Sequence, residues 1–162
     1  MDKNITMLVV EDNSKIRKLL CNILNNVGFQ NVLEAENGQE AWDSLTSNDI
    51  QLILTDWMMP EMSGIELLKK IRTSSESFKK IPILMITASD KTENILEAAK
   101  YEINGYVVKP FSVKTILAKI EEVLKIDQQF LLKLLDLKSV TPGRIKCMQI
   151  GLKAVQDLLS NV

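Results

Sequence analysis

The chain has 162 residues, of which 46% are apolar and 25% are charged, so it can bury a core and is not a disordered polar segment. Its net charge of -1 gives no general electrostatic attraction to nucleic acid or to anionic membranes. The sequence contains no histidine, which excludes histidine-based acid–base catalysis, histidine metal ligands and a phosphohistidine carried by this chain.

Five short apolar runs, separated by segments of mixed polarity, predict five β-strands. Each run is apolar nearly throughout, which is typical of strands in a parallel sheet that is covered by helices on both faces. The runs lie at 6–10, 32–35, 52–55, 83–86 and 106–108.

The segments between these runs carry apolar residues at three- and four-residue steps, which predicts five helices. In the first helix, Asn13 or Ser14 can cap the start, and Gly28 ends it. This alternation predicts a doubly wound α/β fold with a five-stranded parallel sheet and right-handed crossovers. The other helices are expected around 38–48, 65–71, 90–99 and 112–124, with Asp90 and Ser112 as caps of the last two.

Beyond Leu124 the pattern changes, because no further strand-like run occurs. Residues 126–140 are rich in leucine, Thr141-Pro142-Gly143 interrupts the chain, and apolar residues then recur at three- and four-residue steps from Ile145. This pattern predicts a C-terminal helical hairpin whose first arm can continue the fifth helix. We therefore expect a first domain at 1–125 and a helical extension at 126–162.

Three roles are open for the extension at 126–162. Both arms can pack back on the first domain, or they can form a hairpin for homodimerisation or partner docking. A DNA-reading helix-turn-helix is the third alternative, but Arg144, Lys146 and Lys153 are too few for a convincing phosphate-binding surface.

Cysteine usage and hydropathy predict a cytoplasmic protein. Cys21 and Cys147 lie far apart in apolar surroundings, so we expect buried reduced thiols and not a disulfide framework or a metal site. Charged residues begin at Asp2, which argues against a signal peptide. No stretch approaches the roughly 20 apolar residues of a membrane span.

Polar side chains occur where four of the predicted strands end. Glu11 and Asp12 follow the first strand, and Asp56 follows the third. Thr87 follows the fourth strand, and Lys109 follows the fifth. Because the carboxyl ends of parallel strands share one edge of the sheet, we expect these five side chains to converge there.

Three clustered carboxylates repel one another unless a cation compensates them. Lys109 supplies one positive charge, and the remaining excess suits Mg²⁺ bound through oxygen ligands. Asp56 can then be a metal ligand or a nucleophile that forms an acyl phosphate, with Lys109 and Thr87 binding the phosphoryl oxygens. The alternative for Glu11 and Asp12 is that they are solvated acidic loop residues.

Four motifs in this order resemble the response-regulator receiver domain, the phospho-acceptor half of two-component signalling, and especially its chemotaxis regulators. The resemblance covers about residues 5–125 and implies a flavodoxin-like sheet with strand order 2-1-3-4-5. The motifs are Val9-Val10-Glu11-Asp12-Asn13, Asp56-Trp57-Met58-Met59-Pro60-Glu61-Met62-Ser63-Gly64, Thr87-Ala88 and Lys109-Pro110-Phe111.

The resemblance implies a role for each of the site residues. Asp56 would be the phosphorylated residue. Asp12, Asp56 and the backbone carbonyl of Met58 would bind Mg²⁺ directly, and Glu11 would act largely through water. Thr87 and Lys109 would bind the phosphoryl group.

The resemblance also implies how phosphorylation would be transmitted. Thr87 and Tyr106 would act as the switch residues, and the peptide bond between Lys109 and Pro110 would be cis. The signalling face would be residues 91–124. Met58 and Ser89 would influence the rate of dephosphorylation, and the apolar Met58 predicts a long-lived phosphoryl group because it offers water no hydrogen-bond partner.

Taken together, the resemblance implies a phosphorylation-controlled switch and not an enzyme, with only self-catalysed phosphoryl transfer and slow autodephosphorylation. The phosphoryl donor would be a sensor histidine kinase or a phosphotransfer protein. A downstream protein would bind the 91–124 face or the tail, and residues 126–162 could form a homodimer. Alternative readings are a DNA-binding transcription regulator and a receiver fragment of a larger response regulator.

Two classes of α/β enzyme fit the sequence poorly. A flavin-binding protein would have a phosphate-binding loop of Ser, Thr or Gly after the first strand, where Glu11 and Asp12 would repel phosphate. A haloacid-type phosphatase would have a second aspartate at position 58, where this chain has Met58.

Overall fold

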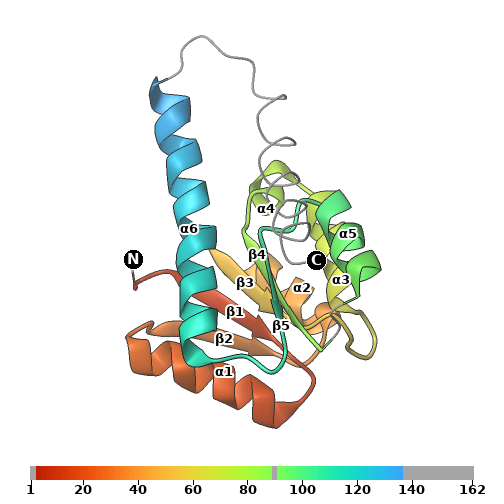
Figure 1. The fold of residues 1–162 in the computed structure, drawn as a ribbon. Coiled ribbons are helices and arrows are strands. Elements are labelled where there is room, and N and C mark those ends of the chain that lie inside the picture. The colour runs from red at the N-terminus through yellow and green to blue at the C-terminus, as the bar shows by residue number, and fades with distance from the viewer. Residues whose placement is uncertain (1–2, 89–90, 137–162) are drawn as a thin grey trace.

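The computed structural model describes residues 3–88 and 91–136, with side chains described through residue 125 (Figure 1). Within these ranges the chain forms five strands and six helices that alternate along most of its length. In chain order they are β1 (Thr6–Val10), α1 (Ser14–Val27), β2 (Asn31–Ala35), α2 (Gly38–Ser47), β3 (Leu52–Thr55), α3 (Gly64–Arg72), α4 (Glu76–Lys79), β4 (Ile83–Thr87), α5 (Thr92–Lys100), β5 (Gly105–Val108) and α6 (Val113–Asp136).

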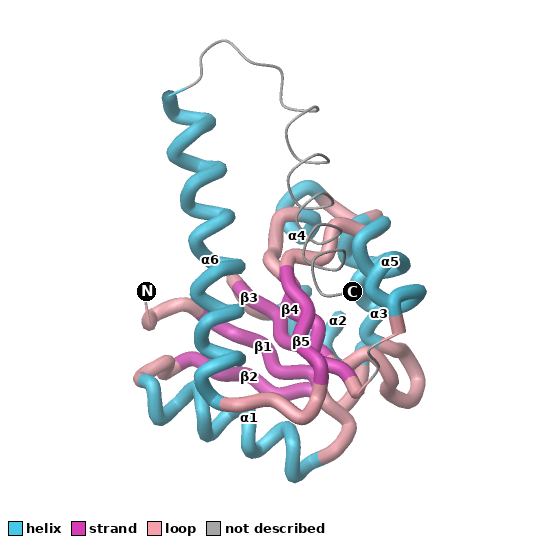
Figure 2. Tube along the Cα trace, viewed as in Figure 1, coloured by secondary structure: helices cyan, strands magenta, loops and turns pink. Residues whose placement is uncertain are grey.

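The strands form one parallel sheet with the order β2-β1-β3-β4-β5, which confirms the predicted fold and topology. Figure 2 shows this sheet in magenta, with helices packed around it. The predicted strand bounds are one residue short at three ends: β2 begins at Asn31, β4 ends at Thr87 and β5 begins at Gly105. Thr87 is therefore a strand residue, in register with Val108 of β5.

Side chains of the strands alternate between two core clusters on opposite faces of the sheet. In β1, Met7 and Val9 belong to one cluster, whereas Leu8 and Val10 belong to the other. Helices α1 and α6 contribute buried residues to the first cluster, and α2, α3 and α5 contribute to the second. Each buried Leu or Val stabilises the fold by roughly 1.5–3 kcal/mol, so both layers hold the strand ends in place.

Helix α1 begins directly after the acidic residues that follow β1. The side chain of Asn13 accepts hydrogen bonds from the backbone amides of Lys15 and Ile16, so Asn13 and not Ser14 is the cap. Gly28 ends the helix with φ of 104°, a left-handed conformation that glycine adopts without a steric penalty. Both helix ends are therefore set locally by the residue types that the sequence places there.

The one-turn helix α4 was not predicted, because four residues are too short to show helical periodicity. Asp90, the predicted cap of α5, and Ser89 lie outside the described residues. Lys91 precedes α5 and makes no side-chain capping hydrogen bond.

Helix α6 is a single helix that runs from Val113 to Asp136, beyond the predicted domain boundary at 125 (Figure 1). The first arm of the expected extension thus continues this helix, whereas the rest of the predicted hairpin, 137–162, lies outside the described residues. The division into 1–125 and 126–162 stays a prediction. None of the described helices combines the length and the apolar character that a membrane span requires.

Candidate functional site

Three carboxylates meet at the carboxyl-terminal edge of the sheet. Glu11 and Asp12 follow β1, Asp56 follows β3, and one oxygen of each lies within 4.8 Å of the others. The side chain of Glu11 is buried, that of Asp12 is exposed, and Asp56 is intermediate. Within the described part of the chain this is the single group of three such residues that could hold a metal ion.

Lys109 brings a positive charge to this cluster from the end of β5. Its Nζ lies 2.7 Å from Glu11 Oε2 and 3.2 Å from Asp56 Oδ2. The backbone amide of Lys109 donates a hydrogen bond of 2.7 Å to the carbonyl of Thr87, which fixes the start of the loop. The peptide bond from Lys109 to Pro110 is cis, as the resemblance implies.

Asp56 is held through both its backbone amide and its side-chain carboxylate. Its amide donates to the carbonyl of Val10 at 2.9 Å, which ties the end of β3 to the end of β1. Its Oδ1 accepts a hydrogen bond of 2.8 Å from the amide of Trp57. Because Oδ2 faces Lys109, the two carboxylate oxygens have different partners.

Two glycines allow the loop after Asp56 to pack tightly. The amide of Gly64 donates to the carbonyl of Trp57 at 2.9 Å, and a Cβ at position 64 would lie 1.9 Å from the carbonyl oxygen of Asp56. The amide of Gly38 donates to the carbonyl of Met62 at 2.9 Å, and a Cβ at position 38 would lie 2.6 Å from that oxygen. Any other residue at either position would displace the loop.

The electrostatics of the cluster favour a bound cation. Burial raises the pKa of Glu11, the Lys109 ammonium opposes this rise, and the charge of Asp56 adds to it. The cluster brings together three acidic side chains and one ammonium, so acidic groups outnumber basic ones. An all-oxygen donor set with this excess of acidic groups fits a hard divalent cation such as Mg²⁺.

The structure describes three of the other four predicted site residues. Thr87 is buried at the end of β4, and the ring of Tyr106 is partly buried against the core cluster of α2 and α3. Met58 directs a side chain that is 71% exposed into solvent, within the loop that follows Asp56. Ser89 lies outside the described residues, so its predicted role in dephosphorylation stays a prediction.

One residue near the site was missed by the sequence analysis. Arg17 in α1 is 7% exposed, and its guanidinium contacts the backbone carbonyls of Glu11 and Asp12. The sequence does hint at this residue, because Arg17 is a charged residue on the same buried helix face as Leu20 and Leu24. Periodicity alone identifies such a residue as unusual but does not show what it binds.

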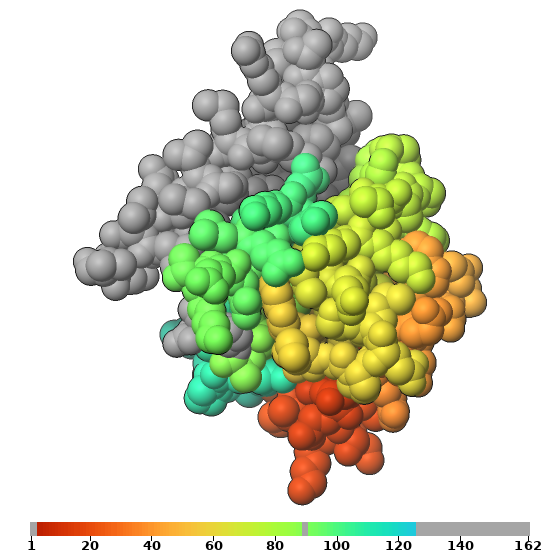
Figure 3. Space-filling view, turned by 90° about the vertical axis from the view of Figure 1, so that its right-hand side faces the viewer, coloured from red at the N-terminus to blue at the C-terminus, as the bar shows by residue number. Residues whose placement is uncertain are grey.

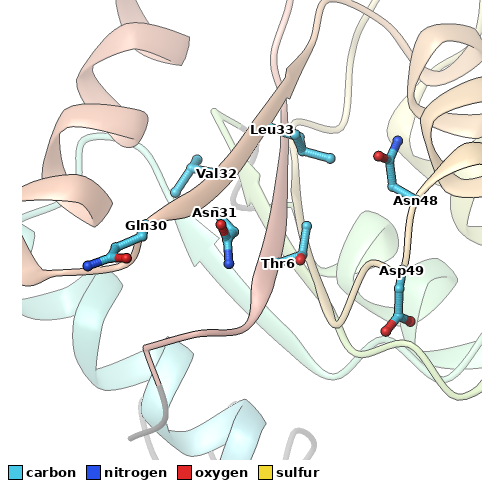
Figure 4. Close-up of a pocket in the computed structure, with 7 residues that line it drawn as sticks. All are labelled: Thr6, Gln30, Asn31, Val32, Leu33, Asn48 and Asp49. Carbon is cyan, nitrogen blue, oxygen red and sulfur yellow. The ribbon is translucent and has the colours of Figure 1, made fainter.

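A concave region lies at the opposite, amino-terminal edge of the sheet (Figure 4). It is an open pocket of about 380 Å³ between the starts of β1 and β2 and the segment that precedes β3. Amide and aliphatic side chains dominate its lining, and Asp49 is its one carboxylate. This pocket lacks the cluster of carboxylates and the ammonium found at the other edge.

Residues 7–121 match the family model of the response regulator receiver domain. This chain belongs to the response-regulator receiver family. Chemotaxis protein CheY1 of Helicobacter pylori is 45% identical to it over 119 residues, which are 73% of this chain and 95% of that protein. Chemotaxis protein CheY-3 of Vibrio cholerae is 43% identical over 125 residues, which are 77% of this chain and 95% of that protein.

Solved structures lead to the same family. The chemotaxis protein CheY4 of Vibrio cholerae superposes with a TM-score of 0.70 at 31% identity, covering 74% of this chain and 98% of that one. The chain is thus a CheY-like receiver of two-component signalling. The family match ends at residue 121, so it does not account for the predicted extension at 126–162.

Proposed function

We propose that this receiver is a phosphorylation-controlled switch in which Asp56 accepts a phosphoryl group in a Mg²⁺-dependent reaction. The observation that supports the proposal most strongly is the placement of Lys109, whose ammonium lies between Asp56 and Glu11. A carboxylate nucleophile, an acidic cluster for a divalent cation and a positive charge for the phosphoryl oxygens are the groups that phosphoryl transfer requires.

In the proposed reaction a carboxylate oxygen of Asp56 attacks the phosphorus of a phosphohistidine on a partner protein. The new bond forms an acyl phosphate, while the bond from phosphorus to the imidazole nitrogen breaks and the nitrogen keeps the electron pair. The hydrogen bond from the Trp57 amide orients Asp56 for the attack. Since this chain has no histidine, the donor is another protein, a sensor histidine kinase or a phosphotransfer protein.

Glu11, Asp12, Asp56 and the carbonyl of Met58 would hold the metal ion. When bound, Mg²⁺ supplies charge neutralisation for the phosphoryl oxygens. Lys109 contributes a second positive charge on the β5 side of Asp56, and its present ion pairs hold it within reach. No enzymatic output is proposed beyond self-catalysed transfer and slow autodephosphorylation.

Transmission of the signal would begin at Thr87 and Tyr106 and reach the face formed by residues 91–124. Helix α5 is suited to respond, because Ala98 is its one buried residue. Its neighbour on the surface is α3, to which the ion pair between Lys69 and Glu97 connects it at 2.8 Å (Figure 3). A small shift of this helix would change the surface that a downstream protein meets.

The proposal is tested by measuring phosphoryl incorporation from a small phosphodonor with and without Mg²⁺. We expect the mass of the wild-type chain to increase by one phosphoryl group when Mg²⁺ is present. Asp56→Asn should show no increase, and the control Asp43→Asn, which changes an exposed aspartate of α2, should behave as wild type. Equal incorporation by Asp56→Asn and wild type would refute the proposal.

A further inference from the structure

A buried arginine of α1 donates hydrogen bonds to the backbone of the loop that carries Glu11 and Asp12. Arg17 Nη1 donates a hydrogen bond of 2.6 Å to the carbonyl of Glu11 and lies 3.5 Å from the carbonyl of Asp12. The guanidinium thus contacts the backbone of two acidic residues at the site.

The charge of Arg17 is balanced by two carboxylates that are not part of the cluster. Its Nε lies 3.2 Å from Glu34 Oε2, and its Nη2 lies 2.7 Å from Glu36 Oε1. These carboxylates are 47% and 64% exposed, whereas the Arg17 side chain is 8% exposed. The planar guanidinium therefore links the end of β2 to the β1–α1 loop in one fixed orientation.

This arrangement determines which oxygens β1 offers to a cation. The carbonyl of Glu11 is engaged by Arg17, so the oxygens left for the cluster are those of the side-chain carboxylates. If that peptide rotated, the direction of the following Asp12 side chain would change with it, since both share the same backbone. The hydrogen bonds of Arg17 oppose such a rotation.

We propose that Arg17 is a positioning residue for the metal site: it holds the β1–α1 loop so that Glu11 and Asp12 direct their carboxylates toward Asp56. The proposal rests on the proposed function for the site that it serves. Its central consequence, an effect on Mg²⁺ affinity, is measured without any phosphoryl transfer.

The direction of the effect separates positioning from simple electrostatics. A positive charge near the cluster repels Mg²⁺, so if charge were the main contribution of Arg17, its removal would strengthen Mg²⁺ binding. If Arg17 positions the loop, its removal weakens binding. Replacing residues that orient the ligands of a metal site through hydrogen bonds commonly weakens metal affinity by about 10–100-fold.

The chain offers a matched control at the other edge of the sheet. Arg72 also directs a partly buried guanidinium to backbone carbonyls, at 3.1 Å from Lys79, 3.0 Å from Ile81 and 3.2 Å from Glu102. These carbonyls precede β4 and β5, far from the acidic cluster in the topology. Loss of Arg72 should therefore destabilise the fold without altering the site.

The experiment compares Arg17→Met, Arg17→Lys and Arg72→Met with wild type in the full chain. Calorimetric titration with magnesium chloride gives the Kd, and urea unfolding in the absence of metal gives the stability. We expect Mg²⁺ to bind Arg17→Met about 10–100-fold more weakly than wild type. Arg17→Lys keeps the positive charge but loses the planar set of N–H donors, so it should also bind Mg²⁺ more weakly. Arg72→Met should bind Mg²⁺ as wild type does, although it should unfold at a lower urea concentration.

The proposal is overturned if Arg17→Met binds Mg²⁺ as tightly as wild type or more tightly, or if Arg72→Met loses as much affinity. Should Arg17→Met fail to fold, Arg17→Lys decides by the same comparison. If wild type binds Mg²⁺ but gains no phosphoryl group from a phosphodonor, the proposed function fails while the affinities still decide the role of Arg17.

Discussion

Lys109 is the cation that pairs with two of the three carboxylates of the cluster. It pairs with Glu11, whose side chain is 2% exposed, and with Asp56, whose side chain is 12% exposed. Its own side chain is 15% exposed, so water screens these interactions only in part. In the proposed reaction this ammonium turns from the carboxylates toward a phosphoryl oxygen.

Lys109→Met removes this positive charge. We expect phosphorylation of Asp56 to slow by about 10²-fold, because a charge that stabilises the transferring group is lost. Binding of Mg²⁺ should strengthen, because the cation no longer meets a positive neighbour. Initial rates of phosphoryl incorporation and calorimetric titration measure the two effects. Lys119→Met, which removes an ammonium paired with Glu122 on α6, should change neither, and an unchanged rate in Lys109→Met would contradict this role.

Gly64→Ala tests the tight packing behind Asp56. The added Cβ would overlap the carbonyl oxygen of Asp56, so we expect a loss of about 1–3 kcal/mol in the free energy of unfolding and a slower phosphorylation. Gly28→Ala is the control, because its left-handed φ makes it destabilising by about 1–2 kcal/mol at the far end of α1. Its phosphorylation rate should match wild type; equal slowing in both variants would show that stability alone controls the rate.

The thiol of Cys21 should react slowly at neutral pH. Burial raises its pKa to about 11, and the nearby charge of Glu34 adds to the rise while Arg17 opposes it. Since the thiolate is the reactive form, the rate of alkylation in a Cys147→Ser background should keep rising with pH toward that value. A rate profile whose midpoint lies at about pH 8.5 would indicate a thiol with an ordinary pKa.

At the scale of elements, the start of α3 fixes the loop between Asp56 and Gly64. Ser63 and Glu66 form a capping box: the Ser63 hydroxyl accepts from the Glu66 amide, and the Glu66 carboxylate accepts from the Ser63 amide. Ser63→Ala should lower the free energy of unfolding by about 0.5–2 kcal/mol. Ser75 precedes α4 without a capping hydrogen bond, so Ser75→Ala should change stability much less. Urea unfolding compares the two, and equal losses would argue against the cap.

The strands and their ends could be predicted from the sequence because the information is local. Apolar runs mark each strand, and a parallel sheet brings Glu11, Asp56 and Lys109 to one edge whatever the details of packing. The roles of Arg17 and Gly38 could not be predicted in this way. Both depend on contacts between segments distant in sequence or on the path of a loop, which periodicity does not record.

At the scale of the whole molecule, the two edges of the sheet differ in chemistry. The carboxyl-terminal edge carries the acidic cluster, and the amino-terminal edge carries the amide-lined pocket and the contacts of Arg72. The first part of helix α6 packs against the sheet, and its C-terminal part extends beyond the sheet (Figure 1). That residues 126–162 support a homodimer or partner docking stays a prediction.

The central claim, that Asp56 is the phosphoryl acceptor, is tested most directly by locating the modified residue. Borohydride reduces an aspartyl phosphate to homoserine, so treatment of the phosphorylated chain followed by peptide mass spectrometry marks the acceptor position. We predict homoserine at position 56, dependent on both the phosphodonor and Mg²⁺. Homoserine at Asp12 or another aspartate, with position 56 unmodified in the wild-type chain, would contradict the account.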